Sequence, residues 1–338
     1  MQMKFTLALS PNDSLHGVMG LRILVALFVL LLPSRIMAAE MTFAERLGWQ
    51  ADDMVIIIHA EDAGMAHAAN RGVLEVLEKG VATSFGIMMP CPWVPAFAKQ
   101  LKDRPNLDTG VHLTFNSEWE GYRWGPLAGK STVPGLVDSE GCFWRTVPLV
   151  TNSATADEVE LEIRAQIERA EKLGMTITHL DSHMGALLAR SDYFERLVKV
   201  GIEKKIPIAA AGGHLTHASQ ENPAAAETQK KFASQLWNAG LPVIDDTHNG
   251  SYEWEPSQKK QRFTTFLHRL KPGITQIAFH PALPTDEFRL ITPAHQSRLS
   301  DTILLNDPEI RKLISDRGII LTTWKELKER RAKASPLN

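Results

Sequence analysis

Acidic and histidine side chains follow several apolar, β-branched runs of the sequence, at the points where those runs end. One run leads directly into Glu61 and Asp62, and later runs end close to His112, His183 and His280. Taken singly, an acidic pair usually solvates a loop and a histidine usually packs in a core. Together, a carboxylate and two histidines that leave coordination positions open are the ligands that a catalytic divalent metal needs. The sequence therefore predicts a metal site where strand ends converge.

Strand-like runs alternate with amphipathic helical stretches from Met54 onward, in about seven units. The alternation predicts an α/β fold, a deformed (β/α) TIM-like barrel in a single domain over residues 40–338, with chemistry at the C-terminal strand ends. A doubly wound open sheet is the alternative. Thr155 and Glu158 have the spacing of a capping box. The expected strands are Met54–Ala60, Ser84–Met89, Asp108–Thr114, Thr176–Leu180, Ile206–Ala210, a segment around Val243, Thr275–Phe279 and Gly318–Thr322. The expected helices are Ala68–Lys79, Val94–Asp103, one from Thr155 to about Leu173, Asp192–Lys204, Ala226–Ala239, Ser257–Leu270 and Trp324–Arg331.

The composition is that of an ordinary globular protein. Of 338 residues, 44% are hydrophobic and 22% are charged, and 37 Lys and Arg against 39 Asp and Glu give a formal charge of −2. Because no basic excess is present, a nucleic-acid partner is not expected.

The first 39 residues are typical of a secretory signal peptide. Arg22 precedes the ten-residue apolar run Ile23–Leu32, and small residues follow near Ala38 and Ala39. Ten helical residues rise about 15 Å, roughly half of a hydrocarbon core, so an uncleaved membrane anchor is the weaker alternative. After cleavage of the signal, no stable membrane span is expected. Translation from Met19 would give a more compact signal. We therefore expect an exported protein, periplasmic or extracellular.

Seven separated motifs in this order resemble the YdjC-like carbohydrate deacetylases, over roughly Val55 to Trp324. They are His59–Met65, Asn70, Gly80–Ser84, Pro90–Trp93, Gly110–Thr114, Thr178–His183 and His280–Pro281. The resemblance implies a deformed (β/α) barrel and metal-dependent hydrolysis of N-acetyl groups on amino sugars. An acetylated saccharide is then the expected partner.

The resemblance also implies roles for individual residues. Asp62, His112 and His183 match the metal ligands, Glu61 matches the general base, and His280 matches the acid or oxyanion partner. The family likeness points to Mg²⁺, whereas a two-histidine, one-aspartate donor set also suits Zn²⁺.

Two positions depart from the usual family pattern. Glu61 stands where the family normally has aspartate, which moves the carboxylate by about one carbon–carbon bond. A misplacement near 1 Å can cost about a hundredfold in rate, so reduced activity or an altered role for Glu61 is one expectation. Met184 stands where many relatives have a further histidine. Asp181, two residues before His183, is expected either to orient a ligand or to be structural. His179 is expected to be structural, and His59 is expected either to pack in the interior or to support a ligand.

The segment 117–151 is rich in Gly, Pro and Trp and interrupts the strand–helix rhythm, so it is interpreted as an insertion over one strand end. Trp119, Arg123 and Trp124 are candidates for saccharide binding, because aromatic faces stack on sugars and polar groups fix hydroxyls. The alternative is that these side chains pack the loop itself.

Two alternative functions are compatible with the same site residues. One is metal-dependent hydrolysis of another amide or of an O-acetyl ester, and another is a carbohydrate-binding protein whose catalysis is impaired at Glu61. Cys91 and Cys142 are the only cysteines, and a disulfide and two free thiols are equally compatible with the sequence. The sequence favours no oligomeric state.

Overall fold

A computed structural model describes residues 40–335 of the chain. The proposed signal peptide, including the alternative start at Met19, lies outside the described residues. Among the described residues, no helix has the length and apolar character needed to cross a membrane.

The strands form one parallel sheet in the order β4-β3-β2-β1-β6-β5, with β7 also paired to β1. The centre of the sheet is β1, whose residues Val55–Ile58 are fully buried, as expected for a strand covered on both faces. The strands are β1 Met54–Ala63, β2 Ser84–Ile87, β3 Thr109–Leu113, β4 His179–Ser182, β5 Asp246–His248, β6 Gly273–Phe279 and β7 Ile320–Leu321.

An irregular segment closes the gap between β4 and β5. Leu180 of β4 bridges Ile208, and Ala211 bridges Ile244, both in parallel. Backbone hydrogen bonds support these bridges, including one of 2.9 Å from the Gly212 N–H to the Ile244 carbonyl. The expectation of a deformed (β/α) barrel is confirmed. The strands expected at Ile206–Ala210 and near Val243 occur only as this weakly paired segment.

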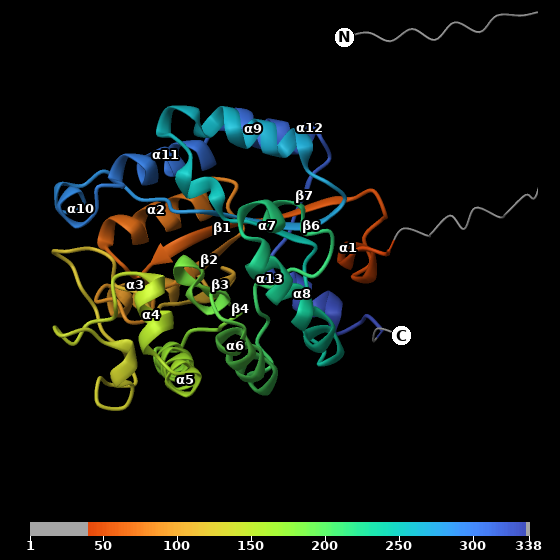
Figure 1. Ribbon diagram of the computed structural model, residues 1–338. Helices are drawn as coiled ribbons and strands as arrows, with labels where there is room; N and C mark the ends of the chain where they lie inside the picture. The colour runs from red at the N-terminus through yellow and green to blue at the C-terminus, as the bar shows by residue number, and fades with distance from the viewer. Residues whose placement is uncertain (1–39, 336–338) are drawn as a thin grey trace, which may run out of the picture. The chain divides into compact units, whose positions relative to one another are not determined.

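Helices surround the strands, with α9, α11 and α12 on one side and α5 and α6 on another (Figure 1). The capping box is present at the start of α5, where Thr155 and Glu158 each accept from the other's backbone N–H. The helices α1, α4, α7 and α10 to α12 were not predicted from the sequence. The helices are α1 Phe43–Arg46, α2 His67–Glu78, α3 Val94–Leu101, α4 Val147–Ser153, α5 Ala156–Lys172, α6 Ser191–Lys204, α7 Thr216–Glu221, α8 Pro223–Asn238, α9 Lys259–Arg269, α10 Asp286–Ile291, α11 His295–Leu305, α12 Pro308–Asp316 and α13 Trp324–Arg331, and short 3₁₀ turns occupy Pro134–Leu136, His183–Leu188, Gly250–Glu253 and Pro256–Gln258.

The segment after β3 folds back on the barrel as an ordered insertion. Buried Glu162 of α5 accepts hydrogen bonds from the backbone N–H groups of Leu127 and Ala128, at 3.1 and 2.8 Å. These bonds satisfy loop donors that would otherwise be costly to bury. Cys91 is buried and Cys142 is half-buried, and both are free thiols.

Two paired glycines leave room for the side chains inside the barrel. Gly86 of β2 lies beside Gly110 of β3. A Cβ atom at Gly110 would lie 2.3 Å from His179 Nε2, and one at Gly86 would lie 3.2 Å from His59 Nε2. Histidines from β1 and β4 can therefore approach each other across the two strands between them.

Replacing Gly110 by alanine should destabilise the fold, because the new methyl group overlaps the buried His179 ring. We expect Gly110→Ala to lower the free energy of unfolding by about 1–3 kcal/mol in chemical denaturation. Gly121→Ala is the control, since a Cβ there meets no atom within 4 Å. Wild-type stability in Gly110→Ala would contradict this description of the barrel interior.

Candidate active site

A β-bulge near the end of β1 turns Asp62 toward the interior. The register between β1 and β2 shifts here, because Ala60 pairs with Phe85 whereas Ala63 pairs with Ile87. The β1 strand therefore has one residue more than β2 between these two pairs. Asp62 has φ of 66°, a left-handed conformation that is uncommon for a residue other than glycine. Such conformations persist where the surrounding structure enforces them, and they cluster at functional sites.

The structure brings Asp62, His112 and His183 together. Asp62 Oδ1 lies 3.4 Å from His112 Nε2 and 3.3 Å from His183 Nδ1, and the two nitrogens are 3.3 Å apart. Ligand atoms that share one ion at about 2.0–2.2 Å lie about 3 Å or slightly more from one another. All three residues are buried, and Asp62 Oδ1 has no hydrogen-bond partner among the described residues. These donors fit a divalent cation.

A charged residue contacts each of these three side chains at the atom that does not face the other two. Asp181 Oδ2 lies 2.9 Å from His112 Nδ1, so Asp181 sits where a ligand-orienting carboxylate is expected. Glu118 Oε2 lies 3.3 Å from His183 Nε2. Arg298 donates to Asp62 Oδ2 at 2.7 Å.

Sequence reasoning missed Arg298 and the role of Glu118 in holding His183. Only the long-range fold brings Arg298 to Asp62, from 236 positions along the chain.

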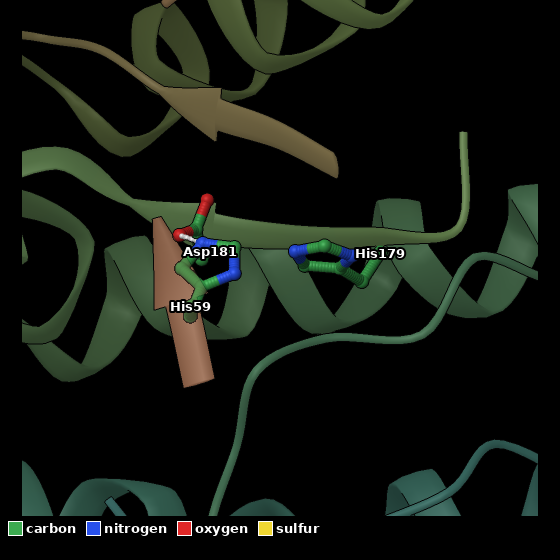
Figure 2. A group of neighbouring side chains, drawn as sticks. All are labelled: His59, His179 and Asp181. Atoms are coloured by element: carbon green, nitrogen blue, oxygen red, sulfur yellow. Dashed lines mark hydrogen bonds and ion pairs between the residues drawn. The ribbon is translucent and has the colours of Figure 1, made fainter. Parts of the chain in front are cut away.

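A second buried group lies behind this set. His59 Nε2 is 2.9 Å from Asp181 Oδ2, and His59 Nδ1 is 3.1 Å from Ser84 Oγ. Figure 2 shows His59 against Asp181, with the ring of His179 directed toward the pair. His59, His179 and Asp181 could themselves hold an ion. The 2.9 Å spacing is that of a hydrogen bond, however, so we interpret the group as support for His112.

Glu61 and His280 form a pair beside the candidate metal ligands Asp62, His112 and His183. Glu61 Oε2 lies 3.1 Å from His280 Nε2 and 3.7 Å from His112 Nε2. The backbone N–H of His280 donates to Asp301 at 3.0 Å, and the ring of Tyr252 meets the His280 ring edge-on, 4.8 Å between centroids. Both Glu61 and His280 line the cavity and are partly exposed to it.

A cavity of about 610 Å³ opens over these residues. Trp119 and Tyr252 form part of its wall, next to Glu61, His183 and Arg298. Besides the candidate metal ligands, the cavity is lined by polar and apolar side chains, among them Leu188, Phe194, Leu197, Glu221 and Asn222.

The insertion supplies only one of its three expected saccharide contacts to this wall. Trp119 lines the cavity, whereas Arg123 and Trp124 do not. Arg123 pairs with Asp138 at 2.6 Å and donates to the Phe143 carbonyl at 2.7 Å. Trp124 is buried and donates to the Asn116 carbonyl. The polar groups of Arg123 and Trp124 are used within the insertion, and substrate contacts of these two residues stay a prediction.

The surrounding carboxylates favour protonated histidines when no cation is bound. Burial opposes the charged form of His112, but Asp181 and Glu61 raise its pKa to about 9. Burial likewise opposes charge on His183, while Glu118 and Asp62 raise its pKa to about 10. Burial alone would raise the pKa of Asp62, yet Arg298 and His183 hold it well below its usual value.

Cation binding should therefore release protons. A metal ligates neutral imidazole, so at pH 7 binding must displace protons from His112 and His183. We expect release of at least one proton per cation, measured as the dependence of the calorimetric binding heat on buffer ionisation enthalpy. Affinity should fall by up to about tenfold per displaced proton for each pH unit below pH 9. Heats independent of the buffer would contradict this assignment.

The amino-acid sequence matches a known protein family and several named relatives. The family model described as YdjC-like protein matches residues 55–316. A carbohydrate deacetylase from Thermoanaerobacter pseudethanolicus is 30% identical over 274 residues, covering 81% of this chain and 99% of the relative. One from Thermus thermophilus is 31% identical over 291 residues, covering 86% and 99%.

A solved structure supports the fold. It is that of a putative cellobiose-phosphate cleavage protein from Enterococcus faecalis V583, with a TM-score of 0.68 at 22% identity, covering 81% of this chain and 99% of the other. The barrel, the site motifs and the family match together show that the chain belongs to the YdjC-like family.

Proposed function

We propose that this protein is a metal-dependent hydrolase that removes acetyl groups from N-acetylated amino sugars or their oligo- and polysaccharides. The observation that carries the proposal is the buried Oδ1 of Asp62, which has no hydrogen-bond partner in the described part of the chain and lies 3.3–3.4 Å from two histidine nitrogens. Relatives of nearly the same domain length are named carbohydrate deacetylases. The activity therefore rests on both the geometry and the family.

Asp62, His112 and His183 would hold the cation. A divalent ion there supplies Lewis acidity toward the acyl carbonyl and lowers the pKa of water. The donor set of two nitrogens and one oxygen suits Zn²⁺, and the family likeness favours Mg²⁺. Asp181 and Glu118 hold the far sides of the two imidazoles, which fixes ring orientation.

Glu61 accepts a proton in the first step of the proposed reaction, and His280 donates one in the second. The Glu61 carboxylate accepts a proton from the attacking water as its oxygen bonds to the acyl carbon. When the carbon–nitrogen bond breaks, His280 donates a proton to the leaving amine, because an amine leaves poorly as an anion. The products are acetate and the free amino sugar. The 3.1 Å contact between the two side chains lets a proton pass from Glu61 to His280 between these steps.

The cavity walls suit a sugar. The aromatic side chains of Trp119 and Tyr252 line the cavity next to the buried Arg298, and carboxylates and amides of the wall can bind hydroxyl groups. We propose that the saccharide lies along this wall with its acetamido group toward Glu61.

Acetate release tests the function directly. The mature protein, stripped of metal, should release no acetate from N-acetylated chito-oligosaccharides, and restoring Mg²⁺, Mn²⁺, Co²⁺ or Zn²⁺ should restore release with at least one of them. Acetate release that persists without metal would contradict metal dependence. Failure with every cation, alongside release from an O-acetyl ester or another amide, would favour the alternative hydrolase.

The base role of Glu61 has its own test. Glu61→Gln should lower kcat by about 10²–10⁴ because the amide cannot accept the proton, while cation binding is kept. Glu61→Asp restores the usual family residue and should remain active. Unchanged turnover in Glu61→Gln would exclude the base role, and activity appearing only in Glu61→Asp would identify the natural chain as an impaired carbohydrate binder.

We also propose that the protein is exported, on the signal-like pattern around Ile23–Leu32. Cell fractionation of the full-length chain, with N-terminal sequencing of the mature form, tests this proposal. A cytoplasmic, uncleaved product would contradict it.

A further inference from the structure

Arg298 is a buried cation beside the metal-ligand set. It lies on α11 and is 2% exposed. Its guanidinium contacts two rings of the cavity wall, with Cζ 5.6 Å from the centroid of Trp119 and 5.5 Å from that of Tyr252. Two aromatic rings therefore fix the position of the guanidinium group.

The side chain of Arg298 is committed to one acceptor. Nη2 donates to Asp62 Oδ2 at 2.7 Å, while Nε and Nη1 are buried without hydrogen-bond partners among the described residues. Asp62 Oδ1 is left facing His112 and His183. The two oxygens of one carboxylate are thus divided between a guanidinium and the proposed metal position.

In this arrangement the Arg298 guanidinium and a metal ion would bind the two oxygens of the same carboxylate. A guanidinium on Oδ2 withdraws charge from the carboxylate and repels a dication on Oδ1, so it weakens metal binding. A site that only had to bind metal tightly would leave both oxygens of Asp62 free to chelate it. The presence of Arg298 therefore calls for a role other than strengthening metal binding.

We propose that Arg298 is a positioning residue that keeps Asp62 a one-oxygen ligand, leaving coordination positions open for water and the acyl carbonyl. A carboxylate that binds through both oxygens occupies an additional position on the ion. Hydrolysis needs such open positions. This inference rests on the proposed function, because it assumes that a cation binds at Asp62.

The same helix also holds the other half of the site. Asp301, one turn after Arg298, accepts from the His280 N–H at 3.0 Å and pairs with buried Lys259 at 2.5 Å. The Ala282 N–H donates to the Arg298 carbonyl at 3.2 Å. Helix α11 therefore fixes Asp62 and the His280 segment relative to each other.

Calorimetric Mn²⁺ titration and steady-state kinetics on Arg298→Met, Arg298→Lys and the wild type test the proposal. Arg298→Met should bind Mn²⁺ about tenfold more tightly, because a competing cation is removed, while kcat falls about a hundredfold. Arg298→Lys keeps the charge and should bind Mn²⁺ within about threefold of the wild type, with intermediate kcat. Arg169→Met is the control, since this half-buried arginine donates to the Met89 carbonyl away from the cavity wall.

Opposite changes in affinity and turnover separate this role from a structural one. Weaker or unchanged Mn²⁺ binding in Arg298→Met, or normal kcat, would overturn the proposal. If Arg298→Met does not fold, a tenfold loss of Mn²⁺ affinity in folded Arg298→Lys would overturn it equally, and wild-type affinity with reduced kcat would support it. A wild-type chain that binds no Mn²⁺ would instead refute the metal dependence of the proposed function.

Discussion

The structure of the site depends on one buried carboxylate. Within residues 40–335, Asp62 Oδ1 has no hydrogen-bond partner, and leaving such a group unpaired in a protein interior is costly. The neighbouring imidazoles can satisfy it as protonated donors, or a cation can satisfy it together with them. The bulge in β1, the left-handed backbone at Asp62 and the pairing with Arg298 all serve to keep this oxygen in that position.

Packing inside the barrel extends this constraint to the other strands. Gly86 and Gly110 remove side chains from β2 and β3, so that His59 reaches Asp181 and Asp181 reaches His112. On the opposite side, α11 connects Asp62 to the His280 segment. The ligand set and the proton-transfer pair are therefore held by one continuous set of buried contacts.

Local sequence signals were sufficient for much of the fold. The β-branched run of β1, the capping box of α5 and the limits of α13 are encoded by neighbouring residues, and the structure agrees with them. The segment between β4 and β5 was harder, because it pairs through isolated bridges and not through a regular strand.

Within the site, side chains at strand ends were predictable and contacts between distant segments were not. The strand-end motifs predict that Asp62, His112 and His183 lie near one another. Arg298 carries no local signal, since its partner is 236 positions away. The acceptors of Arg123 were not predictable either, because Asp138 and the Phe143 carbonyl lie 15 and 20 positions away in the folded insertion.

The most direct test of this account is the position of a bound cation. Anomalous diffraction from crystals grown with Mn²⁺ should show a peak between Asp62 Oδ1, His112 Nε2 and His183 Nδ1. A peak among His59, His179 and Asp181 instead, or no peak at any of these side chains with saturating Mn²⁺, would contradict the central assignment.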